Sequence, residues 1–365
     1  MLNAGELLGD AARLTDSVRL VDLILRAGLL IHASDVHFDP MRDSVRVRFR
    51  IDGMLEEVLR IPAAMASAVT SRLKVLASLD IAERRAPQDG GFSWRMPAGH
   101  SLNPLDVRMA TLPVRHGERI TLRLLEAGGQ RLGLADLGMN DNDRAVFERT
   151  LSNPQGLLLL TGPTGSGKTT TLYAAVNKLL QGSPKNILTV EDPVEYEIPG
   201  VAQAEVDSSD KVNFSKALKS LLRHDPDVVM IGEIRDSASL DAAVKASLTG
   251  HLVLSTLHAN SAKASLTRLV DMGLDAPLAA ATLHLAVAQR LVRRLCPECR
   301  VQSERGWIAK GCDKCGNRGY RGRIGLFEMF SPSAGVDTLM ADDAKAKIAA
   351  GITSEAEVAR VMGEE

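Results

Sequence analysis

The sequence predicts an α/β protein in which a larger domain with a mostly parallel sheet follows a small α+β domain. In the larger domain, which we place at residues 135–365, four apolar runs alternate with three segments of helical spacing. The runs expected to be strands are 157–161, 186–191, 227–231 and 252–256, and the expected helices are 167–180, 239–248 and 261–270. Apolar strands that alternate with helices are typical of a parallel sheet covered on both faces.

The first domain is expected at residues 16–125. Residues 17–30 and 61–79 read as helices, the second with Pro62 near its start. VRVRFRI (45–51) alternates as a half-buried strand does, and Asp52-Gly53 is a hairpin signal. Further strands are expected at 54–59, 92–96, 105–111 and 119–125, whereas HASDVHFDP (32–40) breaks the pattern. Residues 1–15 are expected to be flexible, and the glycines near 126–134 suit a hinge between the domains.

Composition excludes several classes of function. The 365 residues include 44 basic and 45 acidic side chains, so the formal net charge is −1, and aromatic residues make up 3%. A near-neutral chain with few aromatics is not a general nucleic-acid binder, and we expect no direct nucleic-acid partner. No window of about 18 apolar residues predicts a transmembrane helix, and the first residues do not resemble a secretory signal. We expect a cytoplasmic protein whose membrane association is indirect.

Residues 162–169, GPTGSGKT, fit the pattern G-x-x-x-x-G-K-[ST] between an expected strand and an expected helix. Such a loop turns backbone N–H groups toward phosphate oxygens at the positive end of a helix. Lys168 should reach the β- and γ-phosphates, and Thr169 should bind Mg²⁺. We therefore expect ATP and Mg²⁺ as cofactors. The expected binding residues are Gly162, Pro163, Thr164, Gly165, Ser166, Gly167, Lys168, Thr169 and Thr170.

Two acids and a histidine at strand ends are the candidate catalytic residues. Gly232 takes the place before Glu233 that many such enzymes give to a metal-binding Asp, so Glu233 should serve the metal shell itself or act through water. Glu191 is then free to be the general base, with Glu195 as a weaker candidate. His258 could sense the γ-phosphate, with His251 less strongly indicated. The alternatives are surface acids at strand ends and core histidines bonded to backbone.

The four cysteines, Cys296, Cys299, Cys312 and Cys315, form two C-x₂-C pairs with a short spacer. This arrangement predicts a Zn²⁺ site in an insert at about 290–325, against the alternative of four reduced structural cysteines. The flanking segments are rich in arginine. They form either a solvated face or a docking surface for an acidic partner or anionic lipid.

Four stretches together resemble the assembly ATPases of type II secretion and type IV pili: ASDVHFDP, EDPVEY, RHDPDVVMIGEIRD and TGHLVLSTLHANSA. The resemblance runs from about Asp16 to Phe330. It implies a PAS-like first domain, a RecA-like second domain, a flexible linker and a hexameric ring. It also implies that the first domain supplies arginines to the phosphates, which we assign to Arg108 and Arg123, with Arg115 a weaker candidate. The alternative for each is an ordinary surface arginine on a strand.

The resemblance implies an ATP-hydrolysing motor that powers pilin or pseudopilin assembly. The implied partners are further copies of the chain, a polytopic inner-membrane platform protein and other secretion or pilus components, with the motor peripheral at the inner face of the cytoplasmic membrane. The tetracysteine insert resembles that of the assembly branch, although its spacer is shorter than in many relatives. Many relatives also have a long N-terminal docking domain, which we do not expect in this sequence. The alternatives are a DNA-uptake or conjugation motor of the same superfamily and, less strongly indicated, a zinc-ribbon nucleic-acid-binding switch.

Overall fold

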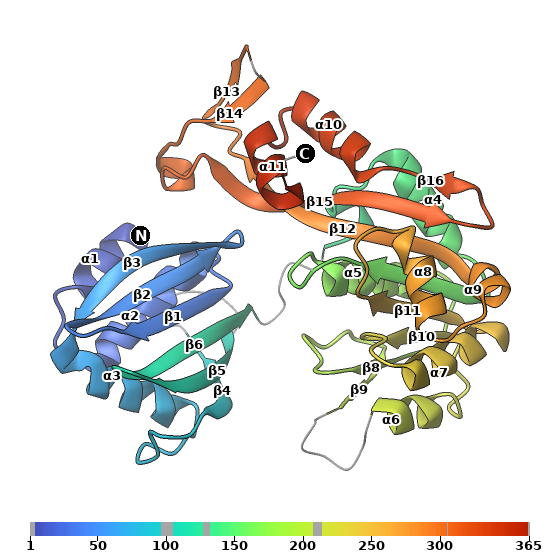
Figure 1. Ribbon diagram of the computed structural model, residues 1–365. Coiled ribbons are helices and arrows are strands. Elements are labelled where there is room, and N and C mark those ends of the chain that lie inside the picture. The colour runs from blue at the N-terminus through green and yellow to red at the C-terminus, as the bar shows by residue number, and fades with distance from the viewer. Residues whose placement is uncertain (1–3, 96–104, 127–131, 207–213, 305, 364–365) are drawn as a thin grey trace. The chain divides into compact units, whose positions relative to one another are not determined.

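The computed structural model describes residues 4–95, 105–126, 132–206, 214–304 and 306–363. The chain divides into two compact units, Met1–Gln130 and Arg131–Glu365, and each is described by itself (Figure 1). Most of the expected hinge, 127–131, lies outside the described residues. Among the described residues, no helix is both long and apolar enough to cross a membrane.

The first unit is an α+β structure around one six-stranded antiparallel sheet, with strand order β3-β2-β1-β6-β5-β4. Its strands are β1 (Asp35–Pro40), β2 (Ser44–Ile51), β3 (Met54–Pro62), β4 (Gln88–Trp94), β5 (Leu105–Val114) and β6 (Gly117–Glu126). Its helices are α1 (Ala4–Ala11), α2 (Ser17–Leu30) and α3 (Ala63–Leu76). In β2, buried apolar residues alternate with less buried polar ones, so one face of the sheet joins the helices in a common core.

Two expectations for this unit were wrong. Within the lead that we expected to be flexible, residues 4–11 form α1, and Leu7 is fully buried in the core of the unit. The segment that appeared to break the pattern is strand β1, in the middle of the sheet between β2 and β6. Its polar residues Asp35 and Asp39 lie opposite arginines of the neighbouring strands, and these partners make charged residues acceptable in a central strand.

The second unit has an eight-stranded sheet of order β16-β15-β12-β7-β11-β10-β8-β9, in which the six strands from β12 to β9 are parallel. The strands are β7 (Gly156–Thr161), β8 (Ile187–Glu191), β9 (Ala202–Glu205), β10 (Val228–Ile231), β11 (Leu252–Leu257), β12 (Leu283–Leu295), β15 (Tyr320–Ser331) and β16 (Val336–Asp337). The helices are α4 (Asp141–Leu151), α5 (Lys168–Leu180), α6 (Phe214–Leu221), α7 (Ser237–Leu248), α8 (Ala264–Asp271), α9 (Ala276–Thr282), α10 (Met340–Ala349) and α11 (Glu355–Met362).

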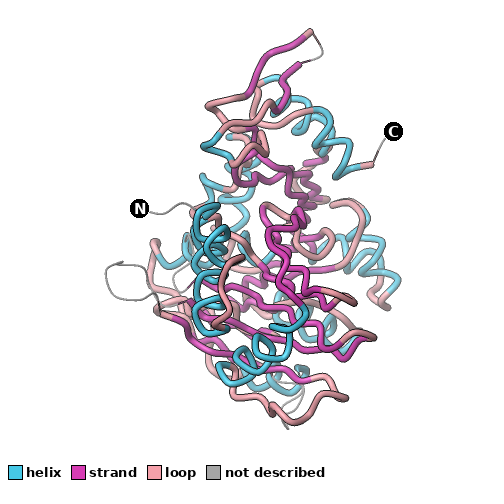
Figure 2. The backbone as a smooth tube through the Cα atoms, turned by 90° about the vertical axis from the view of Figure 1, so that its left-hand side faces the viewer, coloured by secondary structure: helices cyan, strands magenta, loops and turns pink. Residues whose placement is uncertain are grey.

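Strand β7 shows why this sheet is covered on both faces. Leu157 and Leu159 belong to one core cluster, together with residues of α7, whereas Leu158 and Leu160 belong to another, together with residues of α4 and α5. Because neighbouring side chains of a strand point to opposite faces, the all-apolar run requires helices on both sides. The expected RecA-like α/β fold is therefore confirmed. A separate hairpin, β13 (Arg300–Ser303) and β14 (Gly306–Ala309), projects from this unit (Figure 1, Figure 2).

Candidate nucleotide site and cysteine cluster

The phosphate-binding loop connects the buried strand β7 to α5 and depends on glycine. Gly162, Gly165 and Gly167 have φ angles of +142°, +78° and +89°, a region that other residues rarely adopt. A Cβ atom on Gly162 would lie 2.5 Å from the carbonyl oxygen of Gln289, and one on Gly167 would lie 2.8 Å from its Nε2. Both backbone strain and lack of space therefore require glycine at these two positions.

The polar groups of the loop fit a phosphate ligand. Lys168 Nζ donates to the carbonyl oxygens of Gly162 and Pro163, at 2.8 and 3.0 Å, and burial lowers the pKa of this amine. The buried Ser166 hydroxyl finds no hydrogen-bond partner among the described residues. Thr169 is exposed in the first turn of α5, where a hydroxyl could bind Mg²⁺. A cation bonded only to carbonyls and an unpartnered hydroxyl are what a site for an anion would present.

The structure brings Glu233 and His258 to the same edge of the sheet as Lys168. Glu233 follows β10 and His258 follows β11, and the carboxyl ends of parallel strands meet at this edge (Figure 1). His258 Nε2 lies 3.9 Å from Glu233 Oε2, and the charge of Glu233 opposes the lowering of the Lys168 pKa by burial. Arg235 donates to Glu233 and, at 3.0 Å, to Asp192. A carboxylate, a histidine and a lysine thus share one site.

Sequence reasoning missed Thr161, which ties the histidine loop to the phosphate-binding loop. Its hydroxyl accepts from the Ala259 N–H and donates to the Ala259 carbonyl, both at 2.8 Å. Ala259 directly follows His258, and Thr161 directly precedes Gly162. These two hydrogen bonds therefore couple the loop that carries His258 to the phosphate-binding loop.

Glu191 does not fit the expected role of general base. Its side chain is 2% exposed and receives three hydrogen bonds. The donors are the hydroxyl of Tyr173, the hydroxyl of Thr189 at 2.6 Å and the amide of Gln203 at 3.1 Å. A buried carboxylate that already accepts three bonds organises its neighbours and does not meet an attacking water. Glu195 differs: its backbone N–H donates to the Tyr173 hydroxyl at 3.2 Å, and its half-buried carboxylate has no partner among the described residues.

The two arginines assigned to the phosphates lie in the first unit. Arg108 on β5 and Arg123 on β6 are directly opposite one another, so their side chains share the polar face of that sheet. Arg123 Nε lies 3.3 Å from Asp35 Oδ1, and its side chain is 61% exposed. Asp35 was not expected to contribute. It lies within the stretch ASDVHFDP, opposite both Arg123 and Arg50.

The four cysteine sulfurs lie together, all within 4.8 Å of one another. Three of their separations are 3.9, 3.8 and 3.8 Å. A tetrahedral Zn²⁺ with Zn–S bonds of about 2.3 Å places its sulfurs about 3.8 Å apart, whereas a disulfide needs about 2.05 Å. The N–H of Gly319 also points at the Cys315 sulfur, at 3.2 Å. The donor set and its spacing fit zinc.

Helix α11 is attached to strand β12 through one buried carboxylate. Glu357 accepts from Arg293 Nη2 at 2.7 Å and from Arg360 Nη2 at 2.6 Å. Burial raises the pKa of Glu357, but the hydrogen bonds from these arginines outweigh burial and hold it at about 2. The guanidinium of Arg293 also lies 4.1 Å from the ring centre of Tyr320. This network fixes the end of β12 and the start of β15.

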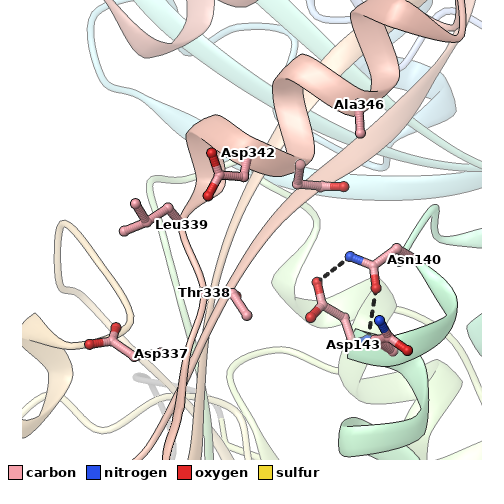
Figure 3. A pocket seen from close by; sticks show the side chains of 9 residues that line it. Asn140, Asp143, Asp337, Thr338, Leu339, Asp342 and Ala346 are labelled. Atoms are coloured by element: carbon pink, nitrogen blue, oxygen red, sulfur yellow. Dashed lines mark hydrogen bonds between the residues drawn. The ribbon is translucent and has the colours of Figure 1, made fainter.

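A cavity of about 450 Å³ lies between α4 and α10, and no residue of the phosphate-binding loop lines it (Figure 3). Several of its lining side chains are acidic, but the buried ones have structural partners. Asn140 donates to Asp143 at 2.8 Å, and Asp343 accepts from the Phe327 N–H at 2.9 Å and from Lys347. The bond from the Phe327 N–H attaches α10 to strand β15.

Comparison with known proteins agrees with this geometry. The profile of the family described as "Type II/IV secretion system protein" matches residues 10–365. The type II secretion system protein HxcR of Pseudomonas aeruginosa is 49% identical over 313 residues, which cover 86% of this chain and 66% of that protein. The type II secretion system ATPase E of Vibrio cholerae is 41% identical over 384 residues, covering 95% and 75%. The type IV pilus assembly ATPase PilB of Myxococcus xanthus is 43% identical over 349 residues, covering 90% and 61%.

Solved structures show the same fold. The Legionella pneumophila ATPase DotB aligns with a TM-score of 0.71 at 22% identity, covering 94% of this chain and 95% of that one. The pilus retraction motor PilT with bound ADP aligns with a TM-score of 0.59 at 25% identity, covering 90% and 87%. The comparisons confirm the resemblance seen in the sequence and, with it, the expected class of enzyme, a secretion-system ATPase. This chain belongs to the type II/IV secretion system protein family.

Proposed function

We propose that this chain is an ATP-driven motor that powers the assembly of pilin or pseudopilin subunits in type II secretion or type IV pilus biogenesis. The observation that carries the proposal is that Lys168, Glu233 and His258 lie together at a phosphate-binding loop whose conformation requires glycine. The names of the relatives, secretion and pilus assembly ATPases, support the mechanical role and favour it over conjugation or DNA uptake. A homohexamer at the inner face of the cytoplasmic membrane, acting on a polytopic platform protein, is part of this proposal.

In this proposal the side chains of the site divide the work of hydrolysis. Lys168 exchanges its two carbonyl partners for phosphate oxygens, and loop N–H groups hold the rest of the triphosphate. Glu233 and the Thr169 hydroxyl would hold Mg²⁺, which would neutralise negative charge on the phosphates. His258 faces Glu233, so loss of the terminal phosphate changes the charge beside it. The Thr161–Ala259 bonds pass that change between the two loops.

We assign the general base to Glu195 instead of Glu191, because the Glu195 carboxylate has no hydrogen-bond partner among the described residues, whereas the Glu191 carboxylate accepts three hydrogen bonds. Exchange of Glu195 for Gln should lower kcat about 100-fold or more while ATP binding persists. Glu191→Gln, the matched control in the same stretch, should lower thermal stability and keep most of its turnover below its melting temperature. Wild-type turnover in Glu195→Gln would remove this assignment.

Arg108 and Arg123 are proposed to stabilise the charge of the transferring phosphoryl group in the assembled ring. The salt bridge to Asp35 holds Arg123 extended on the polar face of its sheet until phosphate competes for it. Steady-state ATPase assays of Arg108→Gln and Arg123→Gln should show a lower kcat. Arg72, on the helical side of the same unit, provides the control position.

The cysteine cluster is proposed to bind one structural Zn²⁺, because its four sulfurs have the separations that the ion requires.

The proposed motor function is tested by Lys168→Gln, which should abolish both ATP hydrolysis and, in cells, secretion or pilus assembly. Lys178→Gln is the control, since Lys178 lies in the last turn of the same helix and is half exposed. Assembly that persists without Lys168 would contradict the motor function.

A further inference from the structure

Strand β12 runs beside the phosphate-binding loop and presents two polar residues to it. Ala288 is paired with Thr161, so Gln289 and Arg290 continue alongside the loop where it leaves β7. Gln289 is 2% exposed and accepts from the Thr171 hydroxyl of α5 at 2.8 Å. Arg290 Nη1 lies 3.1 Å from the position that a Cβ atom on Gly162 would take. The guanidinium therefore lies against the first glycine of the loop.

The hydrogen bonds of Arg290 go to neutral groups only. Nη1 donates to the Gln289 carbonyl at 3.1 Å, and Nη2 donates to the Asn260 carbonyl at 3.4 Å. No carboxylate of the described residues lies within ion-pair distance of this guanidinium. The charge of Glu328 raises the pKa of Arg290, and the Glu328 carboxylate accepts from the Ala262 N–H at 2.7 Å. Burial lowers the pKa of Arg290, and the positive charge of Arg290 in turn contributes to lowering the pKa of Lys168.

Two partly buried cations thus share one end of the site, and each is bonded to carbonyl oxygens. Removing a cation from water is costly unless an anion compensates, and bonds to a phosphate are about twice as strong as bonds between neutral groups. Glu233 acts on Lys168 and Glu328 acts on Arg290 through their charges, but among the described residues neither cation forms an ion pair with a carboxylate. The charge balance of the site is therefore incomplete until an anion binds.

We infer that Arg290 is a second cationic ligand of the nucleotide phosphates, supplied by the same unit as Lys168. It exchanges the Asn260 carbonyl for phosphate oxygens when nucleotide binds. Because Asn260 belongs to the loop that carries His258, this exchange releases one restraint on that loop each time the site fills. The inference rests on the proposed ATPase function and adds to it a phosphate contact that no catalytic motif of the sequence contains.

The test measures binding of fluorescent ATP and ADP analogues to the full chain, with pyrophosphate as competitor, in Arg290→Gln, Arg290→Lys and Arg294→Gln. Arg294 is the matched control, an exposed arginine on the same strand. Losing one charge-assisted contact should raise the Kd for ATP and for pyrophosphate about 10- to 100-fold in Arg290→Gln. Arg290→Lys should recover part of this loss, and Arg294→Gln should bind as wild type does.

Unchanged affinity in Arg290→Gln, or an equal loss in Arg294→Gln, would overturn the inference while leaving the ATPase function standing. Absence of hydrolysis in the wild-type chain would instead defeat the proposed function. Should Arg290→Gln fail to fold, Arg290→Met keeps the aliphatic stem beside Gly162, and its Kd for pyrophosphate decides the question. A second readout is hydrogen exchange of wild-type residues 259–262, which should become faster when the ATP analogue binds. Unchanged or slower exchange there would contradict the release of Asn260.

Discussion

Replacing Tyr173 by Phe isolates the hydrogen bonds that hold the segment around Glu191. The Tyr173 side chain is fully buried, its hydroxyl donates to Glu191, and the same hydroxyl accepts from the Glu195 N–H at 3.2 Å. Phe keeps the ring and its edge-to-face contact with Tyr196, whose centroid lies 4.6 Å away, so no cavity is created. The change therefore removes polar contacts alone.

The expected cost follows from these contacts. A hydrogen bond to a charged group contributes about 1.5–3 kcal/mol, and the bond to a backbone N–H contributes about 1 kcal/mol. Thr189 and Gln203 still donate to the Glu191 carboxylate, which limits the penalty for its burial. We expect Tyr173→Phe to lower the free energy of unfolding by about 2–3 kcal/mol. For a unit of this size that corresponds to a Tm lower by about 4–12 °C.

Calorimetry at fixed protein concentration measures this loss. The two units can melt separately, and the transition of the second unit is identified as the one that added nucleotide raises. A double-mutant cycle with Glu191→Gln should give a coupling energy of about 1.5 kcal/mol or more. A Tm unchanged within about 1 °C, or a coupling energy below about 0.5 kcal/mol, would refute the view that Glu191 has a structural role.

Three further changes test other parts of the structure. Cys312→Ser should lose the bound zinc measured by metal analysis and lower the melting temperature, and a chelator should lower the melting temperature of the wild type but not of the variant. Lys74→Met should destabilise the first unit by about 3–5 kcal/mol in urea unfolding, because it leaves Glu118 charged and buried, whereas Lys74→Met with Glu118→Leu should recover most of that loss. Glu357 stabilises the fold fully above its ordinary pKa of 4.5 and loses this contribution as pH falls toward its folded pKa of about 2, so the difference in urea midpoint between wild type and Glu357→Gln should shrink across that range.

Local patterns in the sequence were sufficient to predict many of the strands and helices of the second unit. The strand before Gly162 is a run of apolar residues, and the phosphate loop is a local motif, so both could be recognised without knowing their neighbours. Strand β12 could not be recognised in this way. It mixes apolar and basic residues, and its polar side chains are accommodated by distant partners, as Arg293 is by Glu357. Strand β1 was missed for the same reason, since Asp35 is compensated by Arg123, far away in the sequence.

The roles of the acids show a sharper limit. Glu191 and Glu233 both follow apolar strands, and nothing in their local sequences marks one as buried and the other as accessible. Their difference comes from tertiary partners: Tyr173 and Gln203 surround Glu191, whereas Glu233 faces His258. The sequence position of an acid at the end of a strand therefore predicts where the residue lies in the fold, but not its role. Its chemistry depends on which donors the neighbouring elements supply.

Strand β12 also connects the two sites of the second unit. Gln289 lies under the phosphate loop, and Leu295 pairs with Tyr320 immediately before Cys296 begins the cysteine cluster. The cysteine cluster therefore joins the two strands at the far end of the β12–β15 ladder. Gln289 lies nearer the middle of this ladder, where it pairs with Phe327 and accepts from the Thr171 hydroxyl. Loss of the metal should loosen the end of the ladder first, because strand ends depend on fewer neighbouring bonds. Zinc removal should consequently lower the melting temperature while changing the Kd for ATP little. If both the stability and the ATP affinity fell together, the disturbance at the cysteine end of β12 would have to extend along the strand to Gln289.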